Sequence, residues 1–153
     1  MSAYNATLTP HQQRVLFPKS RSMEGSFTAF IDTLSVNIQT TSIVHDTTEQ
    51  IFGITGRNAE GQDTVRELYI QFPDNTPAGT NFRLEESEFT KVRVWYSVKS
   101  PTANYSVRVI QGSLSIQQIA PQVIHIQGAC GGATDTNPSG NTHSVVINFD
   151  LRT

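Results

Sequence analysis

The feature that most constrains this chain is an alternation of apolar and polar residues with a period of two. It is clearest near the C-terminus, where Val145, Ile147, Phe149 and Leu151 are separated by single, mostly polar residues. Successive side chains of a strand point to opposite faces, so this pattern indicates strands with one buried face. Ile and Val together make 24 residues against seven Leu, and β-branched residues favour strands over helices. An all-helical fold is excluded.

Short alternating segments are separated by turn-forming stretches at 45–48, 58–61, 73–79 and 101–104. This spacing predicts an all-β, single-domain antiparallel β-sandwich or β-barrel of about 8–10 short strands. Sandwich and barrel produce the same alternation, so both remain open. Gly112 is expected to form a bulge, because the apolar residues occupy odd-numbered positions before it and even-numbered positions after it. Residues 64–69 are the one plausible helical turn.

The first 22 residues differ in charge from the rest. Arg14, Lys19 and Arg21 precede the first acidic residue, Glu24, whereas the remainder carries eight basic and thirteen acidic residues. We expect residues 1–22 to form an irregular basic arm, with 15–17 as its apolar anchor, and 23–153 to form the all-β domain. The arm has no apolar run typical of a secretory signal, so we expect a cytoplasmic protein or export without a classical signal peptide.

Composition limits the possible partners. A net charge of −2 argues against a nucleic-acid binder, and the longest apolar runs are too short to span a bilayer. The single cysteine, Cys130, excludes an internal disulfide. No phosphate-binding glycine motif is present, and we expect no cofactor.

The segment 89–99 carries the strongest candidate binding surface. Val94, Tyr96 and Val98 share one face, which places Trp95, the sole tryptophan, on the other. A tryptophan among cations on an exposed face would suit a sugar or aromatic ligand, or a protein partner. Packing under the N-terminal arm or a second subunit is the alternative explanation. The residues predicted to bind are Lys91, Arg93, Trp95, Ser97 and Lys99.

A second candidate is catalytic. The sequence Gly128-Ala129-Cys130-Gly131-Gly132 resembles the active-site loop of chymotrypsin-like cysteine proteases of small RNA viruses. The resemblance implies a cysteine hydrolase as an alternative function, with a nucleophile, a general base, an acid that orients the base and a histidine lining the specificity pocket. These roles would fall to Cys130, His45, Asp63 or Glu67, and His143, respectively. A flexible Gly-rich loop over 128–142 is the simpler interpretation.

Asp135, Asn137 and Ser139 match the opening of a calcium-loop pattern, and they form a weak candidate metal site. An Asx- and Gly-rich hairpin loop explains the same composition, because Val146 occupies the position where the calcium loop requires Glu. His125 and His143 lack a third ligand in register, so partly buried, hydrogen-bonded histidines are the better prediction.

Two segments carry a further resemblance: Gly25-Ser26-Phe27-Thr28-Ala29-Phe30, and Gly112 to Ile116 leading to 124–128. Their strand rhythm resembles that of small bacterial calycin-like meander β-barrels of unknown function, which implies a meander barrel. From the Trp95 face, the 128–142 loop and the basic arm, we expect a non-enzymatic interaction module. It would bind a protein partner or its own copies, and a glycan as a further option, through the Trp95 face and the 128–142 loop.

Overall fold

The structure is a computed structural model that describes residues 21–22, 24–58, 63–120 and 125–152. It is all-β, with one 3₁₀ helix, η1 (Leu84–Phe89). The strands are β1 (Arg21–Ser22), β2 (Glu24–Ile31), β3 (Leu34–Val36), β4 (Ile38–Asp46), β5 (Ile51–Asn58), β6 (Val65–Pro73), β7 (Thr80–Arg83), β8 (Arg93–Lys99), β9 (Asn104–Ala120), β10 (His125–Thr134) and β11 (Ser144–Arg152). In the part of the chain so described, no helix is long and apolar enough to cross a membrane.

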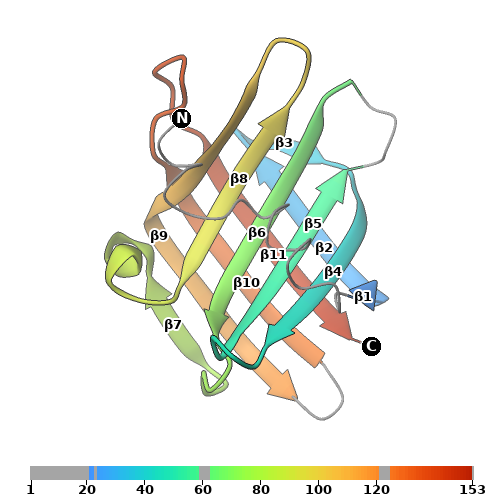
Figure 1. Ribbon diagram of the computed structural model, residues 1–153, viewed down its shortest axis with the longest axis vertical. Helices are drawn as coiled ribbons and strands as arrows, with labels where there is room; N and C mark the ends of the chain where they lie inside the picture. Colours follow the sequence, from blue (N-terminus) through green and yellow to red (C-terminus); the bar gives the residue numbers. More distant parts are fainter. Residues whose placement is uncertain (1–20, 23, 59–62, 121–124, 153) are drawn as a thin grey trace.

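The strands form one antiparallel sheet in the order β1-β4-β5-β6-β8-β9-β10-β11-β2-β3, with β7 paired to β9 beside this path (Figure 1). Because β1 leads into β2 and β3 leads into β4, the two ends of this order belong to neighbouring stretches of chain. Residues 21–22 pair with 42–43, and residues 29–31 pair with 34–36. The sheet is thereby nearly closed into a barrel, the second of the two predicted architectures. Closure satisfies the edges that an open sheet would expose.

The alternation in the sequence becomes the inside and outside of this barrel. Along β11, Val145, Ile147, Phe149 and Leu151 are buried, and the residues between them are more exposed. The interior is completed by side chains from the other strands, including two aromatic pairs, Phe27 with Phe149 and Phe52 with Phe72. Burial of this apolar surface is the main stabilising contribution to the fold.

Three local predictions need correction. Residues 64–69 are not a helical turn, because β6 begins at Val65 and places Leu68 and Ile70 in the core. Residues 128–134 belong to β10, so the connection to β11 is only 135–143. The parity change in β9 is real, but the unpaired residue is Ile110, since Val109 pairs with Thr134 and Gln111 with Ala133. Gly112 instead lies opposite Gly132 with φ of 113°.

The predicted N-terminal arm falls almost entirely outside the described residues. Its last two residues, Arg21 and Ser22, form β1 on β4. Arg14, Lys19 and the proposed anchor at 15–17 lie in the part that the structure does not describe.

Candidate ligand-binding pocket

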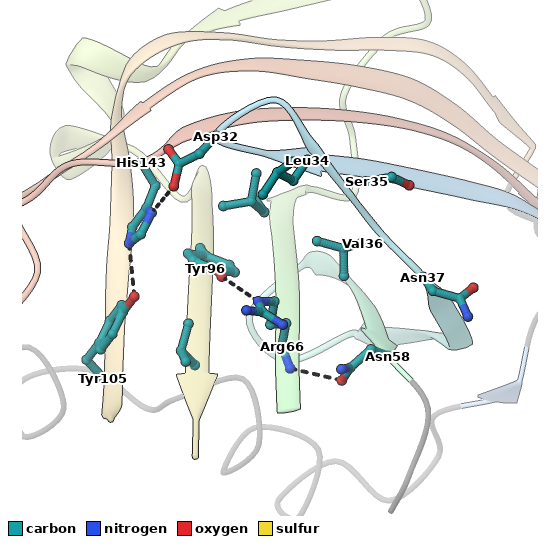
Figure 2. Close-up of a pocket in the computed structure, with 12 residues that line it drawn as sticks. Asp32, Leu34, Ser35, Val36, Asn37, Asn58, Arg66, Tyr96, Tyr105 and His143 are labelled. Carbon is teal, nitrogen blue, oxygen red and sulfur yellow. Dashed lines mark hydrogen bonds and ion pairs between the residues drawn. The ribbon is translucent and has the colours of Figure 1, made fainter. Parts of the chain in front are cut away.

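A pocket with a volume of about 480 Å³ lies at one end of the barrel (Figure 2). It is bordered by the β2–β3 hairpin, the adjoining ends of β5 and β6, the β8–β9 hairpin and the end of the β10–β11 connection. The residues lining it are Ile31, Asp32, Leu34, Ser35, Val36, Asn37, Asn58, Arg66, Tyr96, Val98, Tyr105 and His143. The pocket therefore combines an apolar wall with a convergent set of polar side chains, as small-molecule sites do.

The apolar wall comes from Ile31, Leu34, Val36 and Val98. Leu34 is 72% exposed although it is a large apolar residue, because it lies on the short strand β3 at the rim. Ile31 and Val98 are buried and join the barrel core below. An apolar ligand group entering the pocket would cover Leu34 and remove its surface from water.

A chain of hydrogen bonds runs along one side of the pocket. His143 Nδ1 lies 2.7 Å from Asp32 Oδ2, and His143 Nε2 lies 2.9 Å from the Tyr105 hydroxyl (Figure 2). The amide nitrogen of Asn137 is 3.1 Å from the same Nε2. The imidazole packs edge-on to Tyr96, with ring centroids 5.1 Å apart. Both ring nitrogens of His143 are therefore hydrogen-bonded, and its ring also contacts that of Tyr96.

Asp32 is positioned by an unusual turn. Asp32 and Thr33, the two central residues of the β2–β3 hairpin, have φ values of 52° and 70°. Two-residue hairpins with both φ values positive usually contain Asn and Gly. The Ser144 N–H donates to Asp32 Oδ1 at 3.0 Å. Partial burial raises the pKa of the Asp32 carboxyl, but the hydrogen bonds from His143 and Ser144 outweigh this effect and hold it below its ordinary value.

On the adjoining wall, Arg66 Nε donates to the Tyr96 hydroxyl at 3.2 Å. Its backbone N–H donates to Asn58 Oδ1 at 2.9 Å, and Asn58 in turn donates to the Thr64 carbonyl. Burial raises the pKa of the Tyr96 phenol, and Arg66 partly offsets that rise. Within the described residues, no carboxylate forms an ion pair with Arg66. The pocket thus contains a guanidinium that forms no ion pair with a described carboxylate, although the Asp32 carboxylate also lines the pocket.

The residues of the hydrolase hypothesis do not meet. Cys130 is 3% exposed in the core, in register with Leu114 and Ile147, and burial raises the pKa of its thiol to about 12. His45 is exposed at the end of β4, where it bonds to Asp74 at 3.0 Å. Asp63 is exposed just before β6, and Glu67 is buried beside Arg57 at 3.5 Å. A thiol in this environment stays protonated at neutral pH.

Trp95 lies on the predicted face of the sheet, but its side chain is not exposed as predicted. Trp95 points away from the core, in register with Tyr69, yet it is only 7% exposed. The expectation of an open indole is therefore wrong, and its burial within one chain favours the packing alternative. The buried indole N–H has no hydrogen-bond partner in the described part of the chain.

The polar residues predicted around Trp95 do not form one stripe. The Arg93 guanidinium donates to the carbonyls of Ser87, Thr90 and Val92, which ties it to η1. Lys91 donates to the Glu49 carbonyl at 2.6 Å. Ser97 bonds to Ser106, and Lys99 is exposed at the strand end.

The candidate calcium residues use their side chains within the loop. Asp135 Oδ1 accepts from the Thr136 N–H at 2.8 Å, and Asn137 Oδ1 accepts from the N–H groups of Ser139 and Asn141. These Asx turns are the hairpin-loop alternative. Across the described ranges, no three His, Cys, Asp or Glu residues gather in a geometry that could hold a metal.

The sequence patterns did not identify the polar side chains that face the interior at the strand ends. His125 and His143 are partly buried and hydrogen-bonded, as predicted, with His125 bound to Asp150 at 2.6 Å. Arg66 shares the parity of Leu68, and Tyr105 shares that of Val107, so both occupy core-facing positions at strand ends. The available signal was a polar residue at a position where the alternation of the strand calls for an apolar one.

Comparisons of the chain with protein-family models, with curated proteins and with solved structures found no match.

Proposed function

We propose that this protein is a small-molecule-binding β-barrel that holds an amphiphilic carboxylate in the pocket at the end of the barrel. This function agrees with the binding module expected from the sequence, but its site is the pocket and not the Trp95 face. Its volume of about 480 Å³ falls within the range of small-ligand pockets. A closed barrel supplies a rigid frame for such a site.

The observation that carries the proposal is the Arg66 guanidinium. It lines the pocket, is partly buried, and is fixed through Tyr96 and through the backbone contact to Asn58. A partly desolvated cation that forms no ion pair with a described carboxylate favours an anionic ligand, and the planar guanidinium suits a carboxylate best. The apolar wall around Leu34 and Val98 would receive the alkyl or aryl portion.

A matched pair of ligands tests this proposal. 3-Phenylpropanoate carries a carboxylate and an apolar ring, whereas 3-phenylpropanamide has the same shape without the charge. Isothermal titration calorimetry should give tighter binding of the carboxylate. Arg66→Gln should weaken it by about tenfold or more, since a hydrogen bond to a charged group contributes about 1.5–3 kcal/mol.

Arg83→Gln is the control, because Arg83 is exposed on β7 and does not line the pocket. This variant should bind like the wild type. Equal affinity for the carboxylate and the amide, or unchanged binding by Arg66→Gln, would contradict the proposal.

A second candidate function is self-association, favoured by one feature of the outer surface. Phe30 and Val146 are register partners and are 42% and 45% exposed. The next residue across the sheet is Gly131, above which a Cβ would meet open space. The neighbouring outward positions, Thr28 and Asn148, are uncharged. A projecting phenylalanine beside an open glycine is self-complementary, as a two-fold interface requires.

Light scattering coupled to size-exclusion chromatography tests this second candidate. The wild type should elute as a dimer at micromolar concentration and Phe30→Ser as a monomer. Leu34→Ser is the matched control, because Leu34 is also exposed but lies on the pocket side. A monomeric wild type would rule out association through this face.

A further inference from the structure

The hydrogen-bonded chain Asp32–His143–Tyr105 has a defined direction of proton donation. An ionised carboxylate can only accept, so His143 Nδ1 carries the hydrogen in its 2.7 Å contact with Asp32. In the neutral imidazole, Nε2 then has a lone pair, which accepts from the Tyr105 hydroxyl at 2.9 Å. The three side chains thus form an acid, a base and a hydroxyl in series, the arrangement that activates a weak nucleophile or base.

Several observations indicate that this chain is held in place rather than formed by chance. Asp32 adopts a left-handed conformation that Asn or Gly would occupy with less strain, and Thr33 beside it is β-branched. Both carboxylate oxygens are used, one by His143 and one by the Ser144 N–H. The Asp32 N–H also donates to the Ser144 carbonyl at 3.0 Å. The hairpin therefore fixes the carboxylate against the imidazole.

We propose that Tyr105, activated by His143 and Asp32, is a catalytic acid–base residue, and that the pocket enolises 2-oxo carboxylic acids bound at Arg66. The inference deepens the proposed function and rests on it, because Arg66 supplies the substrate carboxylate site. Tyr105 and Arg66 line the same pocket (Figure 2). His143 and Asp32 act through Tyr105 and are positioning residues.

The chemistry needs no cofactor and no oxidant. The Tyr105 oxygen takes a proton from the carbon next to the ketone while its own proton passes to His143 Nε2. The C–H bond breaks, and its electron pair becomes the C=C bond of the enolate, with the charge on the former ketone oxygen. The resulting imidazolium is stabilised by the Asp32 carboxylate. Return of a proton to the oxygen gives the enol, and return to the carbon regenerates the ketone.

The substrate class follows from the strength of the base. A phenol coupled to an imidazole removes a proton at neutral pH only from a carbon acidified by a neighbouring carbonyl group, since proton transfer requires matched pKa values. A carboxylate on Arg66 and an apolar group against Leu34 and Val98 complete the ligand. Phenylpyruvate has all of these features and is the probe. 3-Phenylpropanoate is its analogue without the ketone.

The experiment follows exchange of the phenylpyruvate C3 protons with D₂O by NMR. Wild type should accelerate exchange above buffer by about a hundredfold, a typical acid–base contribution. Tyr105→Phe should abolish the acceleration and leave the affinity for 3-phenylpropanoate within about twofold. Tyr69→Phe is the matched control, because the Tyr69 hydroxyl lies on the outer face, bonded to Gln71, and this variant should exchange protons like the wild type.

Asp32→Asn separates positioning from a purely structural role. Asn is well suited to the left-handed turn, so the fold should be kept, although its single amide oxygen can replace only one of the two carboxylate acceptors used by His143 and Ser144. Among the described residues, the groups facing His143 are Asp32, Tyr105, Tyr96 and Asn137. Loss of the carboxylate destabilises the imidazolium, so the acidic limb of the rate profile should move to lower pH. A variant with the wild-type profile would contradict the role of Asp32.

The outcomes distinguish the two proposals. If 3-phenylpropanoate binds but phenylpyruvate exchanges at the buffer rate, or at equal rates in wild type and Tyr105→Phe, the catalytic inference is overturned and the binding function stands. If 3-phenylpropanoate does not bind, the proposed function fails, and the assignment of 2-oxo acids to this pocket fails with it.

Discussion

Asp32 and Thr33 illustrate how much of the site depends on single residues that break local rules. Both have positive φ, yet neither is glycine or asparagine. A chain selected only for an unstrained hairpin would place Asn-Gly here. The carboxylate that results faces His143, so the strained turn positions a polar group in the pocket wall. Departures from local preference are expected at functional sites.

Cys130 is the residue for which a pH prediction follows directly. Burial raises the pKa of its thiol from 9.0 to about 12. Between these values the folded state keeps a proton that the unfolded state has lost, so the thiol reduces stability as pH rises above about 9. Urea unfolding should show the wild type losing about 1–2 kcal/mol more than Cys130→Ala between pH 8 and pH 10.5.

The same substitution at pH 8 measures the packing effect alone, because the thiol is then protonated in both states. Comparison of the two pH values within each protein removes that contribution. If both proteins lose equal stability, Cys130 is not buried as the structure places it, and the nucleophile hypothesis regains its basis.

At the level of elements, the period-two pattern predicted most strands because one face of each strand is buried. The inward residues of β11 and β8 were placed correctly for this reason. The alternation predicts the correct face of the sheet for Trp95. It cannot predict that the indole is buried, because it gives the direction of a side chain and not what covers that face. The glycines of residues 128–134 resemble a flexible segment, so the sequence predicts a loop where the structure has β10.

The close packing of β9 against β10 explains why glycines occur on both strands. Gly112 lies opposite Gly132, and a Cβ on Gly112 would be 2.0 Å from the Gly131 carbonyl oxygen. Gly112→Ala should therefore lower the free energy of unfolding by about 2 kcal/mol or more, from the clash and from φ of 113° together. Urea denaturation measures this difference.

Gly131→Ala is the matched control on the facing strand, because a Cβ there would meet open space. It should change stability by no more than about 0.5 kcal/mol. Equal effects of the two substitutions would contradict the β9–β10 register, since this register brings Gly112 close to the Gly131 carbonyl.

For the whole molecule, barrel closure distinguishes one region from the rest. β9, β10 and β11 share long, nearly continuous ladders, whereas the closing seam consists of the two-residue pairing of β1 with β4 and the three-residue pairing of β2 with β3. Short ladders open at lower free energy than long ones. The sequence could not predict this seam, because short segments that alternate equally well do not show which of them pair.

The seam also borders the pocket, so its opening and ligand binding should be linked. Leu34, Ser35 and Val36 form β3 and line the pocket. Amide hydrogen exchange should therefore be fastest in β3 and slowest in β10, with opening free energies that differ by about 2 kcal/mol or more. A ligand that binds only the closed barrel stabilises it by mass action, so 3-phenylpropanoate at 100 times its Kd should slow exchange in β3 by about a hundredfold.

The Arg66→Gln variant should show the same pattern without ligand and lose most of the protection with it. Exchange in β3 as slow as that in β10 would mean that the barrel is closed as firmly at the seam as elsewhere, and a ligand would then enter through the mouth without any opening of the sheet.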